Sequence, residues 1–466
     1  MSALVQSASQ YPALHAAFTE ARRRARVGSG AVLAAVSWPV QTPSPLELFG
    51  AWHDARTSCV YWRSQQPALE LFGWDACLEL CGHDEHRFAD IDRAWRALQA
   101  QAVVHGECSP RLLGGFGFDP QRNSEAQWRH FPAARMAAPR LLLSQDADGQ
   151  RLLCQHLVEA DDDPGALAAQ YCAWADALAA PEPCSDSDIE LLGAEETSSA
   201  HWRDGVERAL AEIRQRRLHK VVLARQVRYS YARSLNPAQV LQRLSDMHGN
   251  AHVFAVAHQD CCFLGATPER LVRLEHGVLR THALAGSTRR GVDEREDQAL
   301  GEALLASAKD RQEHAMVVDA IRAVLAPRAQ QLESPALPGL HRLPNIQHLN
   351  TPFQARLRDG VGLLETIQAL HPTPAVAGLD RDAAMLHIRD HEGFDRGWYA
   401  APIGWLDGAG GGDFAVALRS ALIDGATCYL FAGCGIVADS DPDSEYRETC
   451  LKLAPMRAAL SIEAVA

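Results

Sequence analysis

The sequence predicts an α+β fold in which largely antiparallel strands are flanked by long helices. Segments of alternating or β-branched apolar residues recur over 220–284 and 400–437, separated by turn residues rather than by evenly spaced helices. Two long segments with helical spacing, at about 294–326 and 442–460, follow these strand-rich regions. Strands and helices in separate runs are typical of α+β proteins and argue against a doubly wound parallel sheet.

Composition narrows the class of protein. The chain has 466 residues, 47% of them hydrophobic and 22% charged, which is typical of a globular protein with a sizeable core. With 45 Lys and Arg against 58 Asp and Glu, its formal net charge is −13. Such a chain repels phosphate backbones and anionic lipids, and no apolar stretch reaches the ~18 residues of a bilayer span, so neither nucleic acid nor membrane is an expected partner. The twelve cysteines include no CxxC pair, which favours reduced thiols and a cytoplasmic protein.

Three stretches of the chain differ in their patterns. Residues 1–180 mix helical and strand signals, with apolar runs at 31–37 and 140–144, and are expected to be the amino-terminal part of the fold. Residues 181–199 are rich in Pro, Ser and acidic residues, which predicts a linker-like loop. Residues 200–466 have the sharper pattern and are expected to hold the chemistry of one large unit.

The carboxyl-terminal part is expected to begin with a helix. Ser199 is the predicted cap, because apolar residues recur at helical spacing from Trp202 to Ile213. Strands are then predicted at 220–225, 252–257, 262–266, 270–274 and 278–284. Glu275-His276-Gly277 predicts a hairpin turn between the last two strands. One long helix is expected over 294–326, with Pro327 just past its end.

The last hundred residues return to strands, predicted at 400–406, 414–423 and 427–437. Residues 408–412 (GAGGG) are expected to form a hairpin loop, because a phosphate-binding loop would be followed by a helix and a lysine. Asp441 before Pro442 predicts the start of the terminal helix, since proline fits the first helical turn.

Two pairs of acidic residues share one helical spacing. Asp310 and Glu313 stand three residues apart on the first long helix, and Glu445 and Glu448 repeat that spacing on the terminal helix. Like charges on one helix face repel, and a hard divalent cation such as Mg²⁺ would relieve that repulsion. A solvated acidic helix face is the alternative for either pair alone.

Basic residues offer partners for an anion. Lys452 follows Glu448 by four residues on the same helix face, and Arg419 interrupts the apolar segment 414–423. An arginine buried in such a strand requires an anion, which is either a substrate carboxylate or an internal Asp or Glu. Lys220 begins the strand 220–225 and is either a base in a desolvated cationic pocket or a surface lysine.

Glu269 lies in a corner marked by Pro268, between two predicted strands. A carboxyl group held against apolar strands has a raised pKa and can serve as a general acid. The alternative is that Glu269 pairs with Arg270 and only shapes the turn.

Twenty histidines raise the question of another kind of metal site, but none lies in an HExxH motif. They are expected to be surface residues or hydrogen-bonded core residues, including five in the carboxyl-terminal part: His282, His314, His348, His371 and His387.

Eight short segments between residues 200 and 460 carry a shared signature. They are KVVLAR at 220–225, PERL at 268–271, AGS at 285–287, KDRQEH at 309–314, QHL at 347–349, LHPTPA at 370–375, GWY at 397–399 and EYRETCLK at 445–452. In this order they resemble the chorismate-utilising enzymes. The amino-terminal part, including FGAW at 49–52, is similar to isochorismate synthases of the salicylate and siderophore (pyochelin-type) branch.

The resemblance implies two stacked, largely antiparallel sheets flanked by helices, with chorismate and Mg²⁺ between the long and terminal helices. It implies that Glu313 and Glu448 approach Mg²⁺ directly, while Asp310 and Glu445 hold its waters. The substrate-binding residues that it implies are Ser287, His348, Ala375, Tyr399, Arg419, Gly433, Gly435 and Lys452.

The reaction implied by the resemblance is the isomerisation of chorismate to isochorismate. Water attacks C2 of the ring, and the C4 hydroxyl leaves with a shift of the double bond. Lys220 would take a proton from the water, and Glu269 would protonate the leaving hydroxyl; general acid and base steps are typically worth ~10²–10⁴-fold each. Mg²⁺ would neutralise the ring carboxylate and fix its orientation.

Related enzymes differ in the fate of the ring. Salicylate synthases continue to eliminate pyruvate, and anthranilate or aminodeoxychorismate synthases use ammonia in place of water. The resemblance suggests that Ala375 favours stopping at isochorismate, because the lyase and amine-adding relatives tend to carry Thr there. The expected partners are therefore chorismate and a downstream isochorismate-pyruvate lyase, without a glutaminase subunit. The alternative from another class is a chorismate-binding protein without turnover, against which the intact set of acid and base residues argues.

Overall fold

The strands lie in two layers that are joined by one long strand. The computed structural model describes residues 7–28, 30–53, 57–122, 125–178, 189–196, 198–342 and 346–462. Among these residues every strand pairing except that of β1 with β4 is antiparallel. The first layer contains, in order of pairing, β8 (Leu191–Glu196), β9 (Lys220–Tyr231), β21 (Thr427–Ile436), β20 (Ser420–Asp424), β11 (Cys261–Thr267), β10 (His252–His258), β2 (Cys59–Gln65) and β3 (Ala68–Gly82).

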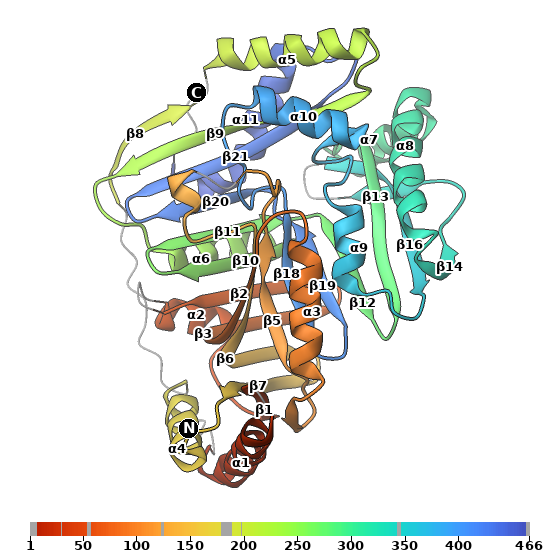
Figure 1. Cartoon of the computed structure of the whole chain (residues 1–466). Coiled ribbons are helices and arrows are strands. Elements are labelled where there is room, and N and C mark those ends of the chain that lie inside the picture. Colours follow the sequence, from red (N-terminus) through yellow and green to blue (C-terminus); the bar gives the residue numbers. More distant parts are fainter. Residues whose placement is uncertain are drawn as a thin grey trace.

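The second layer crosses in front of the first in Figure 1. It contains, in order of pairing, β5 (Arg111–Phe116), β18 (Pro402–Asp407), β19 (Gly412–Val416), β12 (Arg270–Glu275), β13 (Val278–Arg289) and β16 (Ile346–Leu357). Two short strands, β14 (Ala329–Glu333) and β15 (Gly339–Arg342), pair with the far side of β16.

The long strand β6 (Ala134–Asp146) joins the layers. One side of β6 pairs with β3. On its other side, the first half pairs with β5 and the second half with β7 (Gly149–Val158), which continues to β1 (Val32–Pro39) and β4 (Val103–His105). The two sheets expected from the sequence are therefore continuous, and the described strands form one connected sheet of 21 strands, including β17 (Gly378–Leu379) beside β9.

Alternate residues of the central strands enter two different cores. On β10, Phe254 and Val256 belong to the core between the layers, whereas Val253 and Ala255 belong to the core under the outer helices. This division follows from the two-residue period of a strand, which sends successive side chains to opposite faces. A cavity opens at the edge of the core between the layers.

The helices pack against the sheet in two groups. Residues of the outer core come from α1 (Tyr11–Val27), α2 (Pro45–Trp52), α4 (Pro164–Ala177), α6 (Pro237–Met247) and α11 (Pro442–Ala459). Residues of the core between the layers come from α3 (Arg87–Gln99), α5 (Ser199–Arg214), α8 (Ala308–Leu325), α9 (Leu363–Leu370) and α10 (Arg381–His391). Short 3₁₀ turns lie at Ser7–Gln10 and Ala126–Trp128. None of the described helices combines the length and apolar character needed to cross a bilayer.

The predicted α+β class is confirmed, as are the hairpin turn at His276-Gly277 and the start of α11, where the Asp441 side chain accepts from the Ser444 backbone. The cap of α5 lies one residue before the predicted position, because Ser198 rather than Ser199 accepts from the His201 N–H. Part of the segment expected as a linker, Leu191–Glu196, is strand β8 and pairs with β9. Residues 181–188 and 197 of that segment lie outside the described residues.

Two predicted elements are each divided in the structure. The long helix expected over 294–326 is two helices, α7 (Glu294–Ala306) and α8, because Ser307 has an extended backbone and its side chain caps α8. The strand expected over 414–423 is β19 and β20, with the chain crossing between the layers at 417–419. Arg419 has a φ of 47°, in the left-handed region that strands avoid.

Candidate active site

A cavity of about 380 Å³ lies where both layers meet α8 and α11. All the site residues predicted from the sequence line it: Lys220, Glu269, Ser287, Asp310, Glu313, His348, Ala375, Tyr399, Arg419, Gly433, Gly435, Glu445, Glu448 and Lys452. They come from segments up to about half the chain apart, so the fold brings the separate motifs to one place. A larger hollow of about 900 Å³ includes the 408–412 loop, but none of these residues lines it.

Two crossings between the layers carry Glu269 and Arg419 into the cavity. Glu269 lies between β11 of the first layer and β12 of the second, and Arg419 lies between β19 of the second layer and β20 of the first. The crossings run side by side, since Val416 N donates to Glu269 O at 3.0 Å and Ala266 N donates to Arg419 O at 3.1 Å. Backbone hydrogen bonds therefore fix both functional side chains relative to each other.

Helix α8 brings two of the acidic residues to the cavity in its first turns. The Ser307 hydroxyl accepts from the Asp310 N–H at 3.2 Å, and Ser307 also contacts the Asp310 carboxylate. Next to this turn, β13 has a bulge at Gly286, whose φ is 72°. A Cβ at Gly286 would lie 3.1 Å from the Asp310 Cβ, so glycine permits the close approach of β13 to α8.

Lys220, at the start of β9, points into the cavity and pairs with an acidic residue of α8. Its Nζ donates to the Glu313 Oε1 at 2.8 Å, and its side chain is 10% exposed. The lysine chain passes over Gly435 of β21, where an added Cβ would lie 2.8 Å from the Lys220 Cε. Gly435 thus leaves the space in which the lysine lies, and the surface alternative for Lys220 is excluded by its burial.

Lys452, on α11, makes a similar set of contacts. Its Nζ donates to the Gly433 carbonyl at 2.9 Å and lies 2.7 Å from the Glu448 Oε1. The starts of α8 and α11 are also joined by an ion pair of Lys309 with Asp439 at 3.4 Å. The two helices that carry the acidic pairs therefore begin near each other beside the cavity.

Glu269 has the electrostatics expected of a general acid. Burial raises the pKa of its carboxyl group to about 7, although the positive charges of Lys452 and Lys220 act in the opposite direction. The side chain is not the partner of Arg270, which instead pairs with Asp413 at 2.9 Å. A carboxyl group with this pKa is half protonated near neutral pH and can donate a proton to a leaving group.

Arg419 lines the cavity without a protein partner. Its guanidinium makes no hydrogen bond or ion pair within the part of the chain that the structure describes, and burial lowers its pKa. The internal Asp or Glu that the sequence left open as its partner is therefore not found there. An unpaired guanidinium in a half-buried site favours binding of a ligand carboxylate, for which its planar donors are well suited.

The remaining predicted residues form the walls. Tyr399 is buried and stacks on Phe431, with ring centroids 5.2 Å apart. Burial lowers the pKa of His348 to about 4, so its imidazole is neutral at pH 7 and has both a donor and an acceptor nitrogen. Ser287 and Ala375 complete the lining.

The acidic residues offer hard oxygen donors of the kind that Mg²⁺ prefers. Asp310, Glu313, Glu445 and Glu448 all line the cavity, so the donor chemistry fits a divalent cation. No three of their oxygens lie within 4.8 Å of one another, and Glu313 and Glu448 are each paired with a lysine. A cation would therefore replace the lysine partners of these two carboxylates.

Arg396 is a wall residue that the sequence reasoning missed. It is 3% exposed and pairs with Glu392, and its guanidinium donates to the backbone oxygens of Val222 and Val376 at 2.8 Å each. Its charge also lies over the Phe118 ring, 4.3 Å from the centroid. The signal for it was a Glu and an Arg four residues apart, directly before the GWY segment.

Comparisons with known proteins place the chain in a family. Residues 17–461 match the family described as chorismate binding enzyme. The chain is 49% identical to a salicylate biosynthesis isochorismate synthase of Pseudomonas aeruginosa, over 99% of this chain and 97% of the relative. It is 34% identical to the isochorismate synthase MenF of Bacillus subtilis, over 95% of this chain and 96% of the relative. Its fold matches the menaquinone-specific isochorismate synthase MenF of Escherichia coli with a TM-score of 0.79 and 27% identity, over 95% of this chain and all of that one.

Proposed function

Because this chain belongs to the chorismate-binding enzymes, we propose that it is an isochorismate synthase, which converts chorismate to isochorismate. One observation carries the proposal: a buried lysine and a carboxyl group with a pKa of about 7, Lys220 and Glu269, line the same cavity. An isomerisation that adds water at one ring carbon and expels a hydroxyl at another requires a base and an acid of this kind.

The chain's own residues account for each proton. Lys220 takes a proton from the water that attacks C2. Glu269, in its protonated form, donates to the C4 hydroxyl as it leaves with the shift of the double bond. One water is consumed and one is released, so the reaction has no net change in composition, and a proton must pass from Lys220 back to Glu269 before the next turnover.

Positive charge at the cavity would bind the dianionic substrate. Arg419 has a free guanidinium for one carboxylate, and Lys452 lines the same cavity, where its Nζ contacts the Gly433 carbonyl and Glu448. Tyr399, His348 and Ser287 offer polar atoms to the substrate oxygens. Such contacts would explain how a protein with a net charge of −13 takes an anionic ligand.

We propose Mg²⁺ as the cofactor, held directly by Glu313 and Glu448 and through water by Asp310 and Glu445. When bound, the ion would neutralise the ring carboxylate and fix its orientation. Without the ion, the four carboxylates would repel an anionic ring. Their place beside Arg419 and Lys452 supports a shared site for cation and substrate.

We also propose that the product feeds salicylate and siderophore synthesis in the cytoplasm. The relative from Pseudomonas aeruginosa is named for salicylate biosynthesis, and it matches over nearly the whole of both chains. A separate lyase would then remove pyruvate from isochorismate, and no glutaminase subunit would be needed. Eleven cysteines within the described residues form no disulfide, which is in keeping with a reducing compartment.

The product distribution tests the proposal. Purified enzyme, chorismate and Mg²⁺ are separated by chromatography while pyruvate is measured in parallel. Isochorismate without pyruvate is expected, because Ala375 leaves the reaction at the first product. Stoichiometric pyruvate and salicylate would assign the lyase branch, and a dependence on ammonia would assign the amination branch.

Two variants test the roles of the acid and the base. Lys220→Ala and Glu269→Gln are each expected to lower turnover by about 10²–10⁴-fold, while both still bind chorismate. Unchanged conversion in either variant would reject the role of that residue. Binding without turnover in the wild-type protein would instead make the chain a chorismate-binding protein.

A further inference from the structure

Two histidines and a glutamate meet outside the cavity, between α5 and α10. One ring nitrogen from each of His387 and His391 and one Glu212 oxygen lie within 4.8 Å of one another. The histidines are four residues apart on α10, which places both rings on one helix face, with centroids 4.5 Å apart. Glu212 reaches them from the last turn of α5, with its Oε2 3.1 Å from the His387 Nδ1. We propose that these three side chains bind a transition-metal ion, Zn²⁺ first of all.

The state of His387 supports a missing ligand. The residue is 3% exposed, and its Nε2 is buried without a hydrogen-bond partner among the described residues. A neutral ring has one lone pair, and when Nε2 offers it to an ion, the Glu212 carboxylate must turn from Nδ1 to the same ion. Buried nitrogens without a partner are rare in folded proteins, and an ion would supply the partner.

The donor set and the access suit Zn²⁺. Two imidazoles and one carboxylate are the ligands of zinc sites that keep a fourth position for water. Zinc bonds of 2.0–2.1 Å in tetrahedral geometry place neighbouring ligand atoms about 3.3 Å apart, so modest rotations of the three side chains would close the site. The side chain of Glu212 is 28% exposed and His391 is half-buried, which gives an ion a path from solvent.

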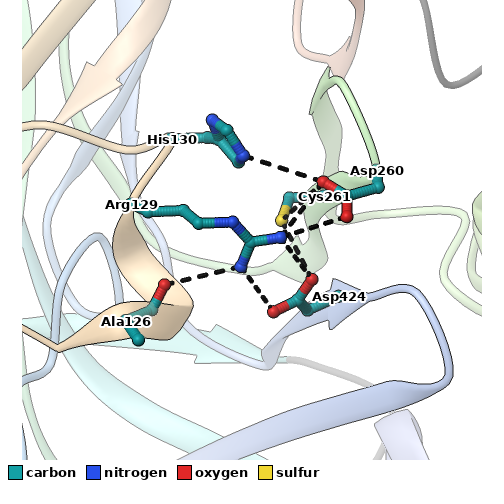
Figure 2. A network of polar contacts seen from close by, with 6 residues as sticks. All are labelled: Ala126, Arg129, His130, Asp260, Cys261 and Asp424. Carbon is teal, nitrogen blue, oxygen red and sulfur yellow. Dashed lines mark hydrogen bonds and ion pairs between the residues drawn. The ribbon is translucent and has the colours of Figure 1, made fainter.

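A second group of metal-type side chains does not support the same inference. Figure 2 shows the Arg129 guanidinium between Asp260 and Asp424, beside His130 and Cys261. Arg129 lies 2.7 Å from an Asp424 oxygen and 3.1 Å from an Asp260 oxygen, so both carboxylates already have a cation. Burial and the nearby Asp424 raise the pKa of the Cys261 thiol, which leaves it protonated. This group is therefore an ion-pair network.

The proposed zinc site is connected to the cavity wall. Directly after His391, Glu392 accepts from the Ala224 N–H at 2.8 Å and pairs with Arg396. Arg396 in turn donates to the Val222 oxygen of β9, a strand that lines the cavity. An ion that joins α5 to the end of α10 would hold this wall in place, and its expected effect is on the stability of the fold.

Zinc binding to the 466-residue chain tests the inference. The metal-free protein is titrated with Zn²⁺ by calorimetry in excess Mg²⁺, a hard cation that prefers the carboxylates of the cavity to imidazole. We expect one Zn²⁺ per chain and a rise in Tm on binding. Glu212→Gln and His391→Gln, at positions that are not fully buried, are each expected to weaken binding by about tenfold or more and to abolish the rise in Tm.

The matched control is His15→Gln, which removes an exposed histidine of α1. It is expected to bind Zn²⁺ as the wild-type protein does. If either Glu212→Gln or His391→Gln bound Zn²⁺ with the affinity of the wild-type protein, the proposed site would be wrong, because the ion would then lie elsewhere. Absence of saturable binding to the wild-type chain would overturn it as well. Neither result bears on the turnover of chorismate, so the zinc site and the proposed reaction are tested separately.

Discussion

The Lys220 Nζ donates to the Glu313 Oε1 at 2.8 Å, so the proposed base is paired with a proposed ligand of Mg²⁺. Lys452 and Glu448 repeat the arrangement at 2.7 Å. Each lysine thus neutralises a carboxylate that would otherwise repel the other acidic residues of the cavity. Binding of a cation to Glu313 would free Lys220 to approach the water, which links cofactor and base through one ion pair.

Gly435→Ala tests whether the path of the Lys220 side chain is required. The new Cβ would lie 2.8 Å from the Lys220 Cε, and the flexible lysine rather than the strand would move. We expect kcat to fall by about tenfold or more with little change in Tm, since the base leaves its place while the fold remains. Steady-state kinetics and thermal unfolding provide the two readouts. Gly193→Ala is the control, because an added Cβ there has no atom within 4 Å, and its kcat should equal that of wild type. An equal loss of kcat in both variants would contradict the account.

The raised pKa of Glu269 predicts how stability changes with pH. Because the folded-state pKa of about 7 lies above the ordinary value of 4.5, the folded protein binds the proton more tightly than the unfolded chain does. This stabilisation is complete below about pH 4.5 and is lost as pH rises towards 7 and beyond. The free energy of unfolding of wild type should therefore fall relative to that of Glu269→Gln over this window. Urea unfolding of both proteins at several pH values measures this difference in the free energy of unfolding. Parallel dependence on pH in the two proteins would show that the pKa of the Glu269 carboxyl group is not raised.

Arg419→Ala is expected to weaken chorismate binding. Its free guanidinium is available for a charge-assisted hydrogen bond to a carboxylate, and loss of such a bond costs about 1.5–3 kcal/mol, or roughly 10- to 150-fold in affinity. Arg419→Lys should recover only part of the loss, because lysine cannot make a bidentate contact. The Kd for chorismate is measured by calorimetry. Arg280→Ala, which removes an exposed arginine of β13, should leave the Kd unchanged; a similar loss there would point to overall charge instead.

Arg129→Ala is expected to lower the free energy of unfolding by about 1 kcal/mol. Arg129 follows the 3₁₀ turn at 126–128 and pairs with Asp260 in the β10–β11 hairpin and with Asp424 in the β20–β21 hairpin. Solvent screening of the partly exposed ion pairs limits their contribution to stability. Hydrogen bonds from Arg129 lower the pKa of Asp424, so this contribution is present above about pH 4 and is lost as pH falls further. Chemical unfolding at pH 7 and pH 3 measures both effects. The control is Arg93→Ala, which breaks the ion pair of a 76% exposed arginine with Asp90 and should have almost no effect on the free energy of unfolding. An equal loss of stability in both variants would contradict a stabilising role of the Arg129 network.

The strand pattern was enough to predict the fold class, and the resemblance of the short motifs to the chorismate-utilising enzymes predicted the residues of the cavity. The division of the long helix at Ser307 was also within reach, because Ser307 followed by Asp310 at the third position is a capping signal. The left-handed backbone conformation of Arg419 could not be predicted from the sequence, because it follows from the crossing of the chain between the layers. His387 and His391 were visible as a helical pair, but Glu212 joins them from 175 residues away and only the folded chain shows it.

Transfer of oxygen from solvent tests the central claim, that Lys220 and Glu269 add a water at C2 and expel the C4 hydroxyl. The enzyme is incubated with chorismate and Mg²⁺ in H₂¹⁸O, and the isochorismate formed at low conversion is analysed by mass spectrometry. The account predicts one ¹⁸O per molecule of isochorismate, in the C2 hydroxyl. Unlabelled isochorismate would mean that the hydroxyl moves within the substrate, and would contradict it.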